Sequence, residues 1–191
     1  MNLPNRLTLL RVFLIPVFLV FLYVDAIPLH FLWALMVFAA ASLTDMLDGK
    51  IARARGLVTN FGKFLDPLAD KVLVITALTA FVELDEIQMS AIPLVLIIAR
   101  EFMVSGLRLL AVEQGVVIAA GIWGKLKTAF TMVTIVGILL YLTLVGDFSV
   151  SIPDFVRTWV LEGLIWISAA LTIFSGCVYL KGCWKYLDSD K

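Results

Sequence analysis

The sequence has little charge for its length and no excess of either sign. Only 16% of its 191 residues are charged, 62% are hydrophobic, and the mean hydropathy is +1.03. A soluble domain is about one quarter charged and about half apolar, so this composition favours an integral membrane protein. The formal net charge is zero. Bulk charge therefore indicates no particular partner, and we expect no nucleic acid partner.

Cysteine, histidine and a signal-peptide cleavage site are also scarce or missing. Cys177 and Cys183 lie six positions apart in an apolar segment and share no helix face closely enough for a disulfide. We interpret them as small apolar side chains that give no redox information. No small-residue cleavage site follows the first apolar run, so we expect that run to be retained.

Six apolar runs dominate the chain. A bilayer core about 30 Å thick requires about 20 apolar helical residues. The sequence thus predicts a single all-α membrane domain over residues 1–191, with six transmembrane helices. A short interfacial helix, residues 2–11, is expected to lead into the first. The expected spans are residues 7–24, 28–47, 64–82, 92–110, 130–145 and 160–180.

The basic residues sort to one side of these spans. With a cytoplasmic N-terminus, every Lys and Arg except Arg157 falls at the cytoplasmic end of the fold. The connections near residues 25, 83–86 and 147–157 are acidic or neutral. The positive-inside rule therefore predicts six spans with both termini in the cytoplasm.

Four aspartates stand close together in this apolar chain. Asp45 and Asp48 are spaced i, i+3, and Asp66 and Asp70 are spaced i, i+4, so on helices each pair shares one face. The predicted topology places all four near the cytoplasmic surface, where they would repel one another without a positive partner. Oxygen ligands without His or Cys suit Mg²⁺ or Mn²⁺, and four carboxylates are enough for two such ions.

The connection between the second and third spans is expected to be short and basic, from Lys50 to Lys63. Asp66-Pro67 fits the first turn of the next helix. Gly49 and Ala52 would let a ligand approach the backbone, although small residues also serve helix–helix contact. Arg53 could hold a phosphate with its fork of donors.

Simpler interpretations exist for these acids. Any one of them could be a helix-end charge that faces water, or could pair with Arg53, Lys63 or Lys71. The pairing of all four on consecutive helices favours a function instead. A small cation transporter is an alternative of another class, but it predicts acids spread through the membrane depth or helices broken near the midplane.

The spacing Asp45-x2-Asp48-Gly49-x2-Ala52-Arg53-x8-Gly62-x3-Asp66-x3-Asp70 resembles, without a departure, the signature of the CDP-alcohol phosphatidyltransferases. The resemblance covers the whole chain in length, span layout and motif position. It implies a homodimer in the bacterial cytoplasmic membrane, with an active site on the cytoplasmic side that binds CDP-diacylglycerol and releases CMP.

The resemblance also implies roles for individual residues. Asp45, Asp48 and Asp66 would be the main ligands of two metal ions that hold the pyrophosphate. Asp70 would lie near the second metal and act as the general base that deprotonates the acceptor hydroxyl. The residues implied to contact CDP-diacylglycerol are Gly49, Ala52, Arg53, Asn5 and Thr8.

Further residues resemble the members of this family that use glycerol 3-phosphate as the acceptor, although they are less specific than the aspartate signature. They are Asn5-x2-Thr8-x2-Arg11, residues 64–71, Arg100-Glu101 with residues 105–108, and residues 124–128. Serine, an inositol phosphate and phosphatidylglycerol stay open as other acceptors within the same class.

A dianionic acceptor needs a basic pocket. Arg108 and Lys125 are the first candidates for its phosphate, and Arg100, Lys127 and Arg11 are further ones. The simpler interpretation of each is ordinary positive-inside charge. Arg100 could instead pair with Glu101 or Asp70.

Overall fold

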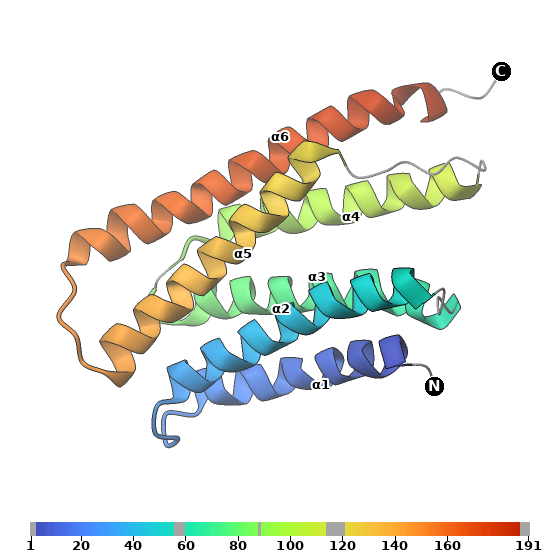
Figure 1. Ribbon diagram of the computed structural model, residues 1–191. Helices are drawn as coiled ribbons and strands as arrows, with labels where there is room; N and C mark the ends of the chain where they lie inside the picture. The colour runs from blue at the N-terminus through green and yellow to red at the C-terminus, as the bar shows by residue number, and fades with distance from the viewer. Residues whose placement is uncertain (1–2, 56–59, 88, 114–120, 188–191) are drawn as a thin grey trace. The chain divides into compact units, whose positions relative to one another are not determined.

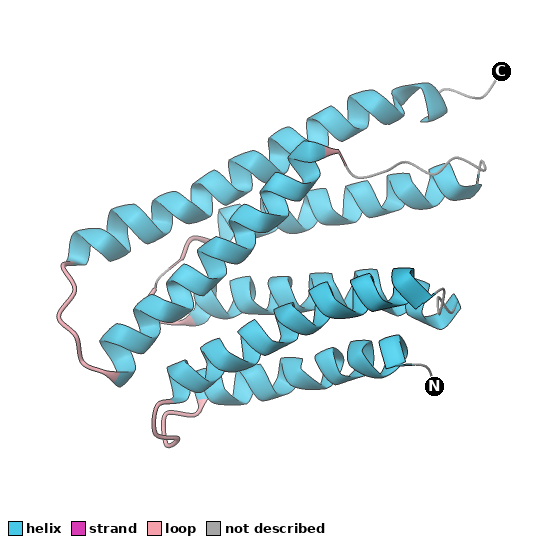
Figure 2. Cartoon of the chain, in the orientation of Figure 1, coloured by secondary structure: helices cyan, strands magenta, loops and turns pink. Residues whose placement is uncertain are grey.

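The computed structural model describes residues 3–55, 60–87, 89–113 and 121–187, and every regular element in them is helical (Figure 2). The expectation of an all-α protein is confirmed, and each of the six apolar runs lies largely within a helix. The helices are α1 (Leu3–Tyr23), α2 (His30–Arg55), α3 (Asn60–Glu83), α4 (Ala91–Glu113), α5 (Ile122–Leu142) and α6 (Glu162–Leu187). Two π-helical turns, η1 (Thr143–Asp147) and η2 (Val156–Leu161), follow α5 and precede α6.

Two continuous helical stretches among the described residues are long and apolar enough to cross a membrane. They are Ile122–Asp147 and Val156–Trp184, while Thr8–Tyr23 and His30–Thr44 are apolar but shorter. These helices, together with the composition, indicate a membrane protein.

Helix boundaries near the aspartates differ from the sequence prediction. α2 continues past Leu47 to Arg55, because residues 50–55 are mostly good helix formers although they are not an apolar run. α3 begins at Asn60, so Asp66 and Pro67 lie beyond its first turn and not within it. The predicted connection from Lys50 to Lys63 is therefore largely helical, and residues 56–59 lie outside the described residues.

The N-terminal boundary differs as well. α1 runs without interruption from Leu3 through residues 7–11 into the first apolar run. The expected interfacial segment is therefore continuous with the first long helix and does not form a separate one.

The first compact unit consists of residues 1–86 and 135–153. In it, α1 packs against both α2 and α3, and α2 also contacts α3 (Figure 1). Phe18 of α1 and Phe38 of α2 meet with ring centroids 5.9 Å apart. Small side chains let the helix backbones approach closely. The buried residues of this core include Leu22, Ala34, Ala41, Leu73, Ala77 and Phe81.

Polar contacts gather at one end of this unit. The Tyr23 hydroxyl at the end of α1 donates to Glu83 Oε2 at the end of α3, over 2.7 Å. The Asp147 carboxylate of η1 accepts the N–H groups of Phe31 (3.4 Å) and Leu32 (2.7 Å), and so caps the start of α2. We call this the hairpin end. The opposite end, which carries the start of α1, the end of α2 and the start of α3, is the motif end.

The second compact unit consists of residues 87–134 and 154–191. Here α4 and η2 pack against α6. The first part of α5, as far as Thr134, belongs to this unit, and the rest of α5 belongs to the first. Polar groups lie in the interior of this unit: the Thr134 and Ser168 hydroxyl oxygens, both buried, are 3.0 Å apart.

Candidate active site

The aspartate motif, residues 45–70, spans the end of α2 and the start of α3. Asp45 and Asp48 lie in α2, and Asp66 and Asp70 lie in α3, as the spacing predicted. The two helices are consecutive and in contact, so both acid pairs belong to the motif end of the first unit (Figure 1). The predicted site residues whose side chains lie outside the described part of the structure are these four together with Asn5, Gly49, Ala52 and Arg53.

The donor set at the motif end fits divalent cations. Each aspartate pair lies in regular α-helix at a spacing that puts both positions on one face. The donors are oxygen atoms only, and four carboxylates need compensating positive charge, which is the chemistry of Mg²⁺ and Mn²⁺ sites. No group of three His, Cys, Asp or Glu side chains gathers elsewhere among the residues that were described in full.

Helix α1 brings a cation toward the motif end. Thr8 and Arg11, both predicted site residues, are 0% exposed and lie one turn apart on one face of α1. A guanidinium buried so completely needs negative charge around it. The sequence therefore places a buried positive charge in the same end of the unit that carries four carboxylates.

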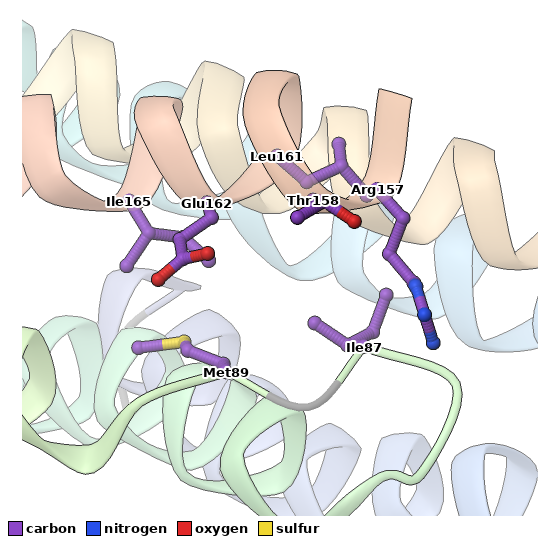
Figure 3. A pocket seen from close by; sticks show the side chains of 7 residues that line it. All are labelled: Ile87, Met89, Arg157, Thr158, Leu161, Glu162 and Ile165. Atoms are coloured by element: carbon purple, nitrogen blue, oxygen red, sulfur yellow. The ribbon is translucent and has the colours of Figure 1, made fainter. Parts of the chain in front are cut away.

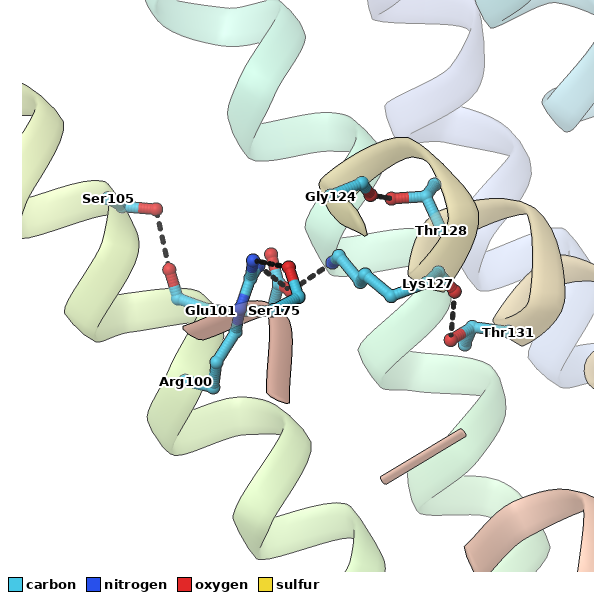
Figure 4. A network of polar contacts seen from close by, with 8 residues as sticks. All are labelled: Arg100, Glu101, Ser105, Gly124, Lys127, Thr128, Thr131 and Ser175. Atoms are coloured by element: carbon cyan, nitrogen blue, oxygen red, sulfur yellow. Dashed lines mark hydrogen bonds and ion pairs between the residues drawn. The ribbon is translucent and has the colours of Figure 1, made fainter. Parts of the chain in front are cut away.

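A second polar cluster lies inside the second unit, and Glu101 of α4 is its centre (Figure 4). Its Oε1 accepts a hydrogen bond from Arg100 Nη1 over 2.9 Å and an ion pair from Lys127 Nζ of α5. Arg100 Nη2 also donates to Ser175 Oγ of α6 over 2.7 Å. We call Arg100, Glu101, Lys127 and Ser175 the Glu101 network. It joins three helices through side chains that are largely buried.

The network distinguishes the cations predicted to bind the acceptor. Of the two pairings considered as alternatives for Arg100, the structure contains the one with Glu101. The pairing of Lys127 with Glu101 was not foreseen, although a carboxylate within an apolar run is itself a signal that a partner exists. Arg108 and Lys125 are exposed. The Arg108 guanidinium lies 5.6 Å from the centre of the Tyr179 ring, a cation–π contact.

A small cavity lies in the second unit between the chain that precedes α4 and the residues of η2 and the start of α6 (Figure 3). Its volume of about 90 Å³ corresponds to roughly three water molecules, so it is far too small for a nucleotide. Its lining residues are Ile87, Met89, Arg157, Thr158, Leu161, Glu162 and Ile165. None of them was a predicted site residue.

Comparison with known proteins gives concordant matches over nearly the whole chain. A family model described as CDP-alcohol phosphatidyltransferase matches residues 1–174. A Bacillus subtilis protein is 38% identical over 99% of this chain and 98% of its own length. A Rickettsia bellii protein is 38% identical over 97% of each chain, and a Pseudomonas fluorescens protein is 37% identical over 100% of this chain and 94% of its own. All three relatives are named CDP-diacylglycerol–glycerol-3-phosphate 3-phosphatidyltransferase.

Proposed function

The chain belongs to the CDP-alcohol phosphatidyltransferase family, and from that premise we propose that it transfers the phosphatidyl group of CDP-diacylglycerol to glycerol 3-phosphate. The products are phosphatidylglycerophosphate and CMP, which places the enzyme in phospholipid biosynthesis. The observation that carries this proposal is identity of 37–38% along nearly the full length of several relatives that share one name. The unbroken aspartate motif agrees with this assignment to the family.

We propose that Asp45, Asp48, Asp66 and Asp70 bind two divalent cations. These ions would neutralise the charge on the pyrophosphate of CDP-diacylglycerol, which is the main requirement of phosphoryl transfer. Gly49, Ala52, Arg53, Asn5 and Thr8 would then contact the rest of that substrate. The oxygen-only donor set and the helical spacing of both acid pairs support the proposal.

The chemical step needs a base. Asp70 would take the proton of the acceptor hydroxyl, and the resulting alkoxide would form a bond to the phosphorus that bears diacylglycerol. The bond from that phosphorus to the CMP oxygen would break, and CMP would leave with its electron pair. Catalysis would consist mostly of positioning and electrostatic stabilisation.

The acceptor phosphate would be held by cations. Arg108 and Lys125 are our first assignment, because both are exposed basic side chains. Lys127 would add to them from within the Glu101 network. Arg100 donates to both Glu101 and Ser175, which supports a structural role for it. The buried Arg11 would contribute positive charge near the motif.

We also propose six spans, with both termini and the active site on the cytoplasmic side of a bacterial inner membrane. The distribution of Lys and Arg supports this orientation. A homodimer is proposed from the family resemblance alone, and cross-linking of the protein in its native membrane would test it.

An acceptor panel tests the function. The purified full-length protein would be given CDP-diacylglycerol with glycerol 3-phosphate, serine, an inositol phosphate or phosphatidylglycerol, and CMP release would be measured. We expect release with glycerol 3-phosphate and background rates with the others. Release only with phosphatidylglycerol would make the protein a cardiolipin synthase of the same family. No release with any acceptor, combined with metal-dependent cation flux in vesicles, would favour a transporter.

A further inference from the structure

The Glu101 carboxylate is the point at which two cations of the second unit meet. One oxygen atom, Oε1, receives both the Arg100 guanidinium and the Lys127 ammonium. The three side chains are only 8–14% exposed. The three groups together carry one net positive charge, because the carboxylate cancels one of the two cations.

The contact of Arg100 with Ser175 stabilises the packing of α4 against α6. Arg100 Nη2 donates to the buried Ser175 of α6, which fixes the guanidinium between two helices. Gly176 leaves just enough room for the Arg100 stem, because a Cβ at Gly176 would lie 2.8 Å from Arg100 Cγ. Both features hold Arg100 against α6, so its donors stabilise the α4–α6 interface.

The Lys127 contact differs, because Lys127 reaches Glu101 from another helix, α5. On α4, residues Glu101, Ser105 and Arg108 recur at i, i+4 and i+7, so they share one helix face. Ser105 Oγ donates to the Glu101 carbonyl oxygen over 2.7 Å, a hydrogen bond within α4 that spans one helical turn. The face that holds Lys127 is therefore the face that presents Arg108.

We propose that Glu101 is a positioning residue that holds the Lys127 ammonium ready for the phosphate of the acceptor. This inference rests on the proposed function, in which the acceptor is glycerol 3-phosphate. A lysine that is already held loses less side-chain freedom when the phosphate binds, and ordering a free one weakens binding by about three- to tenfold. Glu101 also limits the positive charge of the network, so that Lys127 is held without a strong repulsion from Arg100.

Substitution of Glu101 by Gln tests this role in the full-length enzyme in detergent micelles. Steady-state CMP release would be measured while each substrate is varied in turn. In Glu101→Gln we expect the KM for glycerol 3-phosphate to rise about three- to tenfold. The KM for CDP-diacylglycerol and kcat should stay within about twofold.

Two matched variants separate positioning from packing. Lys127→Ala should raise the same KM, and the double variant should be no worse than Lys127→Ala alone, since both changes remove one interaction. Ser175→Ala breaks the contact of Arg100 with Ser175. It should lower the unfolding temperature and leave both KM values unchanged.

The contrary results are distinct. A KM for glycerol 3-phosphate that falls in Glu101→Gln would mean that the carboxylate competes with the acceptor, and would overturn the inference. Equal changes in both KM values and kcat, as from general loosening, would overturn it too. If Glu101→Gln fails to fold, Lys127→Ala still tests the inference. An unchanged KM for glycerol 3-phosphate in Lys127→Ala would be sufficient to reject the inference. Wild-type enzyme without glycerol 3-phosphate turnover would instead contradict the proposed function itself.

Discussion

The two compact units handle their polar groups in different ways. In the first unit Phe18 packs on Phe38, polar contacts between helices lie at the hairpin end, and Thr8 and Arg11 are buried toward the motif end. The second unit carries polar groups within its interior, where Arg100 and Ser175 are both buried. The first unit therefore has polar groups toward both of its ends, whereas in the second a largely buried ion-pair network joins three helices.

This difference separates stability from chemistry. Four aspartates belong to the motif end, and without a bound cation we expect such acids to repel one another, so the apolar contacts of the core must stabilise the first unit. In the second unit, by contrast, the charged groups are part of the core, and removal of one leaves its partner buried without compensation. Changes at the motif end should therefore abolish activity at little cost in stability, whereas changes in the Glu101 network should lower stability and alter the KM for glycerol 3-phosphate by about tenfold at most.

Removal of metal should have the largest effect. We expect EDTA to abolish CMP release entirely and either Mg²⁺ or Mn²⁺ to restore it, since the carboxylates alone add negative charge to an anionic substrate. Binding of the ions should also stabilise the fold, by about 2.7 kcal/mol at a hundred times the dissociation constant. Activity and thermal unfolding would be measured on the same samples. Failure of both ions to restore activity would contradict our assignment of the metal.

Substitution of one aspartate of the motif should have the next largest effect on activity. Asp48→Asn is expected to lower kcat/KM by more than about 100-fold, because even residues behind a metal ligand typically change activity by 10–100-fold. The metal-free variant should unfold at the same or a higher temperature than the metal-free wild type, since one repelling charge is gone. Asp45→Ala and Asp66→Ala should behave in the same way.

Asp85→Asn is the matched control for this change, because Asp85 is an exposed acid in the turn that follows α3. It should leave activity and metal-dependent stabilisation unchanged. Full turnover by Asp48→Asn would show that the motif does not bind the catalytic metal.

The sequence was sufficient to predict the six helices, because each contains an apolar run that only a helix can bury in a membrane. It was insufficient at the end of α2, where Lys50, Arg53 and Arg55 interrupt the apolar run although most residues there have good helix propensity. Pro67 suggested a helix start, and α3 instead begins at Asn60. Local breakers are overridden when a helix is held by packing on both sides.

Contacts between residues far apart in the sequence were harder to predict than those between neighbours. The Arg100–Glu101 contact joins sequence neighbours and was one of the two pairings considered for Arg100. Lys127 and Ser175 lie far along the chain from Glu101, and a single sequence contains no signal that selects one cation or hydroxyl among many. The aspartate motif was identifiable because its spacing matches a family signature within one stretch of sequence, whereas the Glu101 network is set by how α4, α5 and α6 pack.

Removal of Arg100 should have the largest effect on stability. Arg100→Ala leaves the buried Glu101 with less compensating charge and Ser175 without its donor. Loss of one partner from a buried ion pair typically costs about 3–5 kcal/mol. Arg108→Ala on the same helix is the control, because an exposed cation–π contact contributes only about 0.5–1 kcal/mol. Unfolding in mixed micelles would measure both, and equal losses would mean that the interior network is no more important than a surface contact.

A substitution at the hairpin end should cause the smallest loss of stability. Asp147→Ala removes the acceptor for the N–H groups of Phe31 and Leu32, and loss of a helix cap costs about 1–2 kcal/mol. Leu32 and Asp45 are separated by about 20 Å of α2 at 1.5 Å per residue, so turnover per folded molecule should not change. Asp85→Ala, an exposed acid without a capping role at α2, should alter stability by less than about 0.5 kcal/mol. A fall in kcat without a loss of stability in Asp147→Ala would show that the hairpin end influences the chemistry through α2, and the separation of roles within the first unit would then be wrong.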